Sequence, residues 1–291
     1  MATVLKDEAV EANPWDVSRA ELFANDVWQE PMRQMRETAP IHYCPESKFG
    51  PYWSVTTYKP IMHIEALPKV FSSSWEYGGI TVAGDGIDHL QEGDVPMPMF
   101  IAMDPPQHTA QRRTVAPAFG PAEVERMRAE TVARTAAVLD SLPLNTPFDW
   151  VEKLSIELTT QMLAILFDFP FEERHKLTHW SDVLGDIESF GTLEQRQHRL
   201  ATAFEMGASF KELWDKKAQN PGKHDLISIM LQSDAMKHMS HEEFMGNLIL
   251  LIVGGIAPRP VANRANTSAS FARDFKAIKG GTIPRPTRFG P

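Results

Sequence analysis

One short segment combines residue types that together could bind a carboxylate. It covers residues 103–113 and reads Met-Asp-Pro-Pro-Gln-His-Thr-Ala-Gln-Arg-Arg. Its two prolines favour a helix start, so His108 and Arg112, four residues apart, are expected on one face of a helix. Asp104 is expected to cap that helix by accepting from its free N–H groups. An arginine can hold a carboxylate through two hydrogen bonds while a histidine adds a third. The alternative is a solvated pair on a helix surface.

The Met-Asp-Pro-Pro prefix makes this segment resemble the C helix of bacterial cytochromes P450, the haem-thiolate monooxygenases. In that family the histidine and the arginine hold a haem propionate, and the resemblance assigns these roles to His108 and Arg112. Further segments resemble the family in order: 41–44 and 49–56 its first strands, 70–73 and 78–81 its segment between helices B and C, 148–151 and 155–160 the start of its helix E, and 247–255 the first half of its I helix. The match runs from about residue 15 to Gly255 and is most similar to the alkane hydroxylase subfamily.

The resemblance implies a fold that is mainly α with a small β-sheet, and haem as the cofactor. It implies terminal hydroxylation of medium-chain alkanes, a small apolar substrate, with O₂ and with electrons from a ferredoxin and a ferredoxin reductase. Gly254 and Gly255 would lie beside the haem. Gly79, Ile80 and Thr81 would contact the substrate, with a mobile surface loop as the alternative. No Gly-x-Gly-x-x-Gly motif occurs that would bind a nicotinamide or a flavin, which agrees with separate electron donors.

The chain departs from the family pattern after Gly255. The family continues with Asn-Asp-Thr-Thr-Arg, whose acid and threonine deliver protons, whereas this chain continues Ile-Ala-Pro-Arg-Pro. Two prolines so close together cannot continue a helix. The family's Glu-x-x-Arg pair and its Phe-x-x-Gly-x-x-x-Cys-x-Gly loop are not reached before Pro291. The one cysteine, Cys44, lies in a strand-like segment and is expected to be a half-buried structural side chain. Because a haem-thiolate enzyme needs a proximal cysteine, we expect the chain as written to be inactive.

Composition changes at the same place. Residues 256–291 hold seven Lys or Arg against one Asp, a net charge of +6. Because the whole chain has a net charge of −9, the first 255 residues carry −15. A basic segment rich in proline and glycine buries little apolar surface. The sequence therefore predicts an N-terminal extension over 1–14, one incomplete P450-type domain over 15–255, and an unrelated, disordered tail over 256–291 that fits a reading-frame shift. A nucleic-acid-binding or membrane-binding arm is the alternative for the tail. The acidic remainder argues against nucleic acid.

Periodicity and turn residues predict the elements between these landmarks. We expect helices over 19–38, 58–65, 106 onward, 121–142, 152–167, 171–186 and 193–217, and strands over 41–44 and 52–56. A long loop is expected between Gly78 and Pro98. Ser240 and Glu243 predict a capping box ahead of an apolar, buried helix.

Other classes of function remain as alternatives. One is a haem-free, non-catalytic fragment or apolar-ligand-binding remnant using the helix over 240–255. Another is a metal hydrolase using His175 and His179, whose four-residue spacing can hold a metal. The longest apolar run, 248–253, is far too short for a membrane span. With no signal-peptide pattern and one cysteine, the sequence predicts a cytoplasmic protein.

Overall fold

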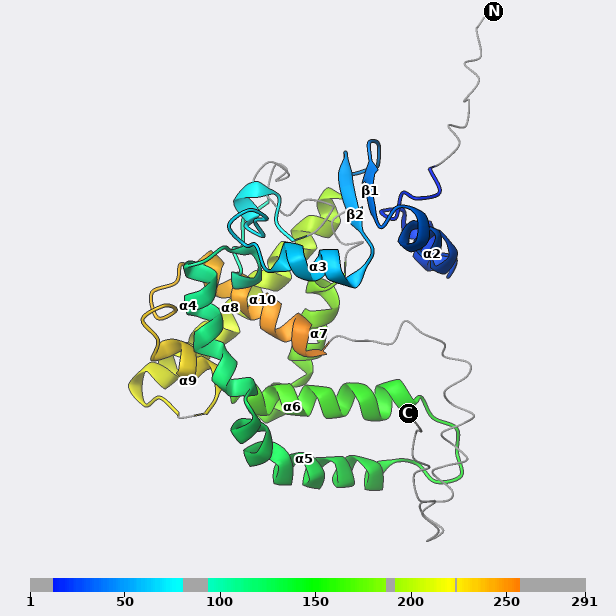
Figure 1. Cartoon of the computed structure of the whole chain (residues 1–291). Helices are drawn as coiled ribbons and strands as arrows, with labels where there is room; N and C mark the ends of the chain where they lie inside the picture. The colour runs from blue at the N-terminus through cyan, green and yellow to red at the C-terminus, as the bar shows by residue number, and fades with distance from the viewer. Residues whose placement is uncertain (1–12, 81–93, 187–191, 223, 257–291) are drawn as a thin grey trace, which may run out of the picture. The chain divides into compact units, whose positions relative to one another are not determined.

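The computed structural model describes residues 13–80, 94–186, 192–222 and 224–256 (Figure 1). The chain divides into two compact units, residues 1–116 with 232–247 and residues 117–231 with 248–291. Helices dominate both, and the strands of the described residues form one two-stranded sheet. This confirms the expected mainly α architecture with a small sheet. No helix in the described ranges combines the length and apolar character that crossing a bilayer requires.

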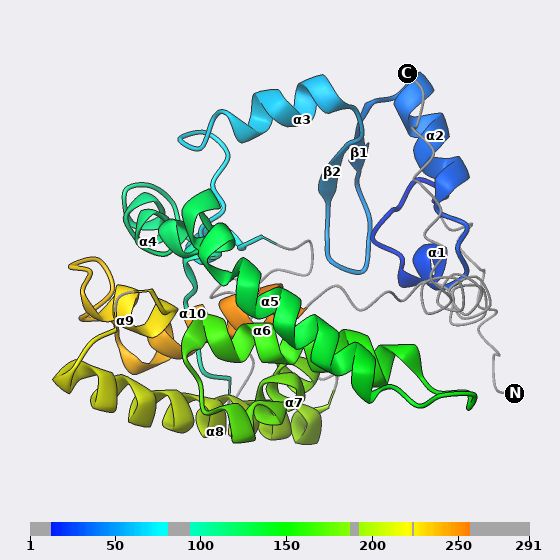
Figure 2. The same cartoon turned by 90° about the horizontal axis from the view of Figure 1, so that it is seen from below.

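The first unit contains short helices and one hairpin (Figures 1 and 2). Its helices and strands are α1 (Ala20–Ala24), α2 (Gln29–Thr38), β1 (Ile41–Cys44), β2 (Tyr52–Val55), α3 (Tyr58–Glu65) and α4 (Gln107–Val115), with 3₁₀ turns at Trp75–Tyr77 and Phe100–Ala102. β1 and β2 are antiparallel, with Ile41 opposite Val55 and Cys44 opposite Tyr52. The strands and α3 lie where the sequence predicts them.

The prediction of one helix over 19–38 is wrong, because the chain breaks between α1 and α2. Asp26 adopts a left-handed backbone with φ 54°. The N–H of Val27 donates to the oxygen of Leu22 at 2.9 Å, and that of Asp26 to Phe23 at 3.1 Å. These bonds close α1 in the manner of a Schellman motif, which an aspartate tolerates because its short polar side chain accepts the left-handed region.

Cys44 is fully buried, and not half-buried as the sequence predicted. Its Sγ lies 3.7 Å from Nδ2 of Asn13, which donates to it, and Sγ itself donates to the main-chain oxygen of Glu46 at 3.3 Å. The chain ahead of α1 therefore covers the thiol that the strand pattern alone would leave at the surface. The assignment of Cys44 to a structural role is consistent with this environment.

The second unit is a set of packed helices: α5 (Pro121–Ser141), α6 (Glu157–Phe167), α7 (His175–Leu184), α8 (Leu193–Gln219) and α9 (Leu226–Leu231). A π-helical turn, Val151–Ile156, leads into α6. Four aromatic rings form the centre, with Trp180 against Phe169 at 5.8 Å and Phe167 against Phe210 at 5.3 Å. Edge-to-face packing of this kind adds to the burial of large apolar surfaces.

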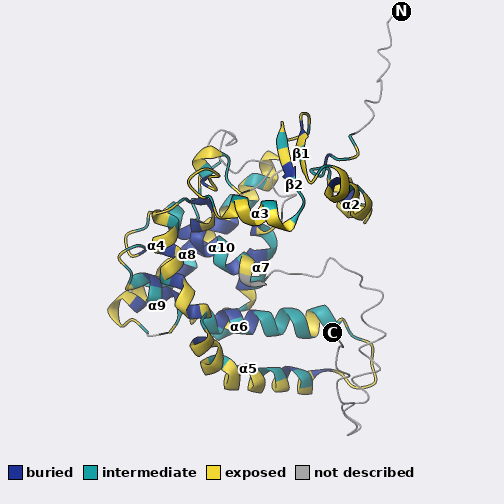
Figure 3. Ribbon diagram, in the orientation of Figure 1, coloured by how far each residue is buried: buried dark blue, intermediate teal, exposed yellow. Residues whose placement is uncertain are grey.

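The apolar helix predicted after Ser240 is α10 (His241–Ile256), whose residues are divided between the units. Met245, Leu248 and Ile252 are fully buried, and Figure 3 shows much of α10 in the colour of buried residues. The predicted capping box is half formed. Oγ of Ser240 accepts from the N–H of Glu243 at 3.1 Å, while the carboxylate of Glu243 accepts from Gln111 instead.

Candidate functional site

The turn ahead of α4 is anchored through the side chain of Asp104. Its carboxylate accepts from Oγ of Ser72 at 2.5 Å and from the N–H of Ser73 at 3.0 Å. The expectation that Asp104 caps α4 is therefore wrong: the N-cap position belongs to Pro106, and no side chain caps the helix. Asp104 stands two residues before that position, so its carboxylate ties a distant loop to the turn, while its main-chain oxygen accepts from the N–H of His108 at 3.0 Å.

His108 and Arg112 lie on α4 as predicted, one helical turn apart. His108 is half-buried, with its ring 6.5 Å from the ring of Phe100, and Arg112 is exposed. Neither side chain has a hydrogen bond or an ion pair to any other part of the chain that the structure describes. An imidazole and a guanidinium are thus held on one rigid helix face with their donors free, which is the arrangement that a carboxylate ligand requires.

A buried polar network fixes α4 to the first half of α10. The side-chain oxygen of Asn247 accepts from the N–H of Phe100 at 2.8 Å. Its Nδ2 donates to Oε1 of Gln111 at 3.1 Å, and Nε2 of Gln111 donates to the carboxylate of Glu243. The sequence analysis did not predict this network, because Gln111 and Asn247 are 136 residues apart and no local pattern indicates their contact.

Gly254 and Gly255 form the end of α10 and belong to the second unit. At Gly254 an added Cβ would meet no other atom within 4 Å, so the helix backbone is open there to an approaching group. α10 is described as far as Ile256. Pro258, which the sequence argument excludes from a helix, lies outside the described residues.

The predicted substrate residues fall at the edge of the described chain. Gly79 has φ 76° and donates its N–H to the oxygen of Ser74 at 3.0 Å, closing the turn after the 3₁₀ segment Trp75–Tyr77. Ile80 is 47 % exposed. Thr81 lies outside the described residues.

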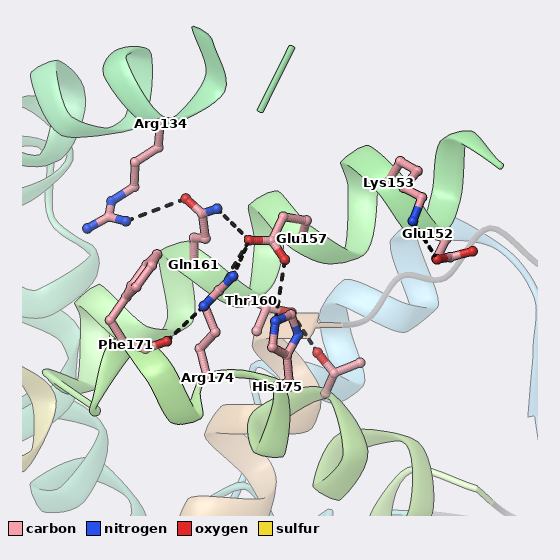
Figure 4. A network of polar contacts seen from close by, with 10 residues as sticks. Arg134, Glu152, Lys153, Glu157, Thr160, Gln161, Phe171, Arg174 and His175 are labelled. Carbon is pink, nitrogen blue, oxygen red and sulfur yellow. Dashed lines mark hydrogen bonds and ion pairs between the residues drawn. The ribbon is translucent and has the colours of Figure 1, made fainter. Parts of the chain in front are cut away.

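A second polar site lies in the second unit, beside a cavity of about 500 Å³ whose lining includes Glu157, Gln161 and His175 (Figure 4). One oxygen of Glu157 accepts from Nε2 of Gln161 at 2.6 Å and from Nη2 of Arg174 at 2.8 Å. The Arg174 guanidinium also lies over the ring of Phe171 at 4.3 Å. Burial acts to raise the pKa of Glu157, but these hydrogen bonds hold it below its usual range.

His175 joins this second site, whereas His179 does not. Nε2 of His175 lies 3.8 Å from the other carboxylate oxygen of Glu157, and both histidines are exposed on α7. Within the described ranges no three His, Cys, Asp or Glu side chains gather closely enough to hold a metal ion. The geometry thus places His175 beside the carboxylate of Glu157.

Comparisons with known proteins point to one family, although no protein-family model matches the chain. Linalool 8-monooxygenase of Pseudomonas putida is 26 % identical over 244 residues, 82 % of this chain and 60 % of that protein. Cytochrome P450-153 from Novosphingobium aromaticivorans is 52 % identical with a TM-score of 0.74, covering 83 % of this chain and 59 % of the other. CYP153D17 from Sphingomonas sp. PAMC 26605 is 58 % identical with a TM-score of 0.73, covering 84 % and 60 %. The chain belongs to the cytochrome P450 family.

This P450 chain spans about 60 % of the length of these three relatives. Its fold is accordingly an incomplete P450 fold, and haem is the cofactor that membership of the family implies. The described residues fit that group. His108 and Arg112 offer unpartnered donors for a propionate, and Gly254 leaves the backbone of α10 uncovered.

Proposed function

We propose that this chain supplies the propionate-binding helix and the distal helix of a haem-dependent monooxygenase that hydroxylates medium-chain alkanes at the terminal carbon. The observation that carries the proposal is the pair His108 and Arg112 on α4, which has no partner among the described residues, in a chain of the P450 family. Bound haem supplies the activation of O₂, from which one oxygen atom enters a C–H bond and the other leaves as water.

The residues of α4 orient the cofactor in this proposal. Arg112 would hold one propionate through two parallel N–H donors, and His108 would add a hydrogen bond from the preceding turn. Because both side chains rise from one short helix, the propionate, and with it the plane of the haem, would take one orientation. Gly79 and Ile80, with Thr81 after them, would contact the apolar substrate, and Gly254 and Gly255 would lie beside the haem.

The substrate class and the electron donors follow from the resemblance to one subfamily. Two P450-153 structures, 52 % and 58 % identical, support the resemblance to the alkane hydroxylase subfamily that residues 15–255 display. The proposal includes a ferredoxin and its reductase as the electron donors, as the resemblance to that subfamily implies.

The test uses two porphyrins that differ only in charge. Haemin carries free propionates, and its dimethyl ester does not, so the ratio of their dissociation constants measures carboxylate recognition. We expect the 291-residue chain to prefer haemin, and Arg112→Leu to lower that preference by about tenfold, the loss of about one charge-assisted hydrogen-bond pair.

Arg113→Leu is the matched control, since Arg113 is an exposed arginine on the same helix. Both variants remove one positive charge from α4, so only the loss of a specific contact should distinguish them. Arg113→Leu should therefore leave the preference for haemin within about twofold of the wild-type value. Equal effects of the two substitutions, or a wild-type chain without any preference for haemin, would refute the propionate role of Arg112 and with it the proposed function.

A further inference from the structure

Asn247 is a fully buried amide in the middle of α10 whose hydrogen-bonding groups are all used. Its Oδ1 accepts from the N–H of Phe100, and its Nδ2 donates to Gln111 and lies 3.1 Å from Sδ of Met239. Burying an amide is unfavourable unless such partners are present. An asparagine at this point of an otherwise apolar helix face therefore has a specific task in joining segments.

The hydrogen-bond partners of Asn247 are neighbours of His108 and Arg112, the two residues of the proposed propionate clamp. Phe100 presents its ring to His108 at a centroid distance of 6.5 Å. Gln111 immediately precedes Arg112, is itself buried and accepts from Asn247, which opposes rotation of α4 about its axis. One side chain thus holds the segment beneath His108 and the helix turn that carries Arg112.

Gly246 brings the same segment close to α10. A Cβ at this position would collide with the main-chain oxygen atoms of Met97 and Pro98. Only glycine lets the chain that leads to Phe100 approach the helix backbone so closely. This approach brings the N–H of Phe100 within hydrogen-bond reach of Asn247.

We infer that Asn247 is a positioning residue for the cofactor clamp: through Phe100 and Gln111 it sets where His108 and Arg112 meet the haem propionate. The inference rests on the proposed function, since it concerns the same clamp. A satisfied buried network rigidifies the elements it joins, and its loss lets them shift. Such a shift at α4 would cost carboxylate recognition first, because bidentate hydrogen bonds need both direction and distance.

The test is the preference of the full chain for haemin over its dimethyl ester in Asn247→Leu, which keeps the number and branching of the side-chain heavy atoms and removes the hydrogen bonds. We expect the preference to fall about fivefold while the affinity for the ester stays nearly unchanged. In the double variant Asn247→Leu/Arg112→Leu, the arginine substitution should cost less than it does alone, since the misplaced guanidinium has already lost its contact.

Two further variants separate positioning from stability. Leu226→Ala creates a cavity at a fully buried leucine of α9 in the second unit. It should change the affinity for the two porphyrins by the same factor and so leave the preference for haemin unchanged. Gln111→Met removes only the α4 partner of Asn247 and should reproduce part of the loss if Asn247→Leu does not fold.

The outcomes distinguish this inference from the proposed function. A wild-type chain that shows no preference for haemin overturns both. A preference that Arg112→Leu abolishes, but that Asn247→Leu and Gln111→Met leave unchanged even where both porphyrins bind more weakly, overturns the positioning role and leaves the proposed function standing.

Discussion

Single residues decide the polar chemistry of this chain, and their roles differ in how visible they are in sequence. The shared helix face of His108 and Arg112 can be predicted from their spacing, because residues four apart lie on one face, whereas their propionate role comes from the family resemblance. Asp104 shows the limit of that reasoning: its type suits a cap, but its carboxylate binds Ser72 and Ser73, more than 30 residues away. Long-range partners are set by tertiary packing, which local sequence does not encode.

Glu157 provides a prediction at this scale. Glu157→Gln should lower the free energy of unfolding by about 1 kcal/mol at pH 7, since the carboxylate, 22 % exposed, loses its charge-assisted bonds to Arg174. The pKa of Glu157 in the fold lies below its ordinary value of 4.5. The charged form therefore stabilises the fold above pH 4.5, and this contribution disappears as the pH falls through the lower folded-state pKa.

Urea denaturation of both proteins from pH 7 to pH 3 would check this, with Glu152→Gln as the exposed control. The difference in free energy of unfolding between wild type and Glu157→Gln should narrow steadily as the pH falls. The difference between wild type and Glu152→Gln should stay near zero throughout. A difference that is constant over this range would contradict an ionic role for Glu157.

At the scale of elements, most helices can be predicted from their turn residues and apolar period. The bounds of α3 agree with the expected 58–65, and α5 begins at the proline that the sequence indicates. The errors have local causes: the left-handed Asp26 divides the helix expected over 19–38, and α9 is a six-residue helix too short to show a period. The π-helical turn before α6 has no sequence signal that periodicity could detect.

The end of α8 is joined to the end of α6 by Lys217, and this junction yields a second stability prediction. The lysine side chain is only 9 % exposed, and its Nζ donates to Asp168 at 2.6 Å and lies 3.1 Å from Asp225. Lys217→Met should cost about 3 kcal/mol, because it leaves the carboxylate of Asp225, which is also 9 % exposed, without its cation.

Thermal unfolding compared with Lys216→Met would measure the effect. Lys216 is exposed and neighbours Lys217 on α8, so its loss should change the melting temperature by a degree or two at most. Equal shifts for the two variants would show that the buried ion pairs of Lys217 contribute no more than surface charge.

For the whole molecule, the sequence resemblance and the comparisons agree on a P450 chain that spans about 60 % of its relatives. The chain divides into two compact units, a division that no linker composition indicates. The domain boundaries expected at residues 15 and 255, and the nature of the basic segment after Gly255, stay predictions. The proposed alkane hydroxylation also stays a prediction, and it concerns the activity of the whole enzyme.

A prediction at this scale follows from Cys44. Its thiol is fully buried in the hairpin and donates to Glu46, so it is unavailable as an iron ligand. We expect the 291-residue chain reconstituted with haem and reduced under CO to lack the Soret band typical of thiolate ligation. Cys44→Ser should leave the spectrum unchanged. A thiolate-type band that disappears in Cys44→Ser would contradict this reading.

The most direct test of the central claim is a crystal structure of the chain with haemin bound. We expect one propionate to lie on α4, with Nη atoms of Arg112 and a ring nitrogen of His108 at about 2.7–2.9 Å from its oxygens. A haemin whose propionates face solvent, or are held by other residues while Arg112 stays unpartnered, would contradict it.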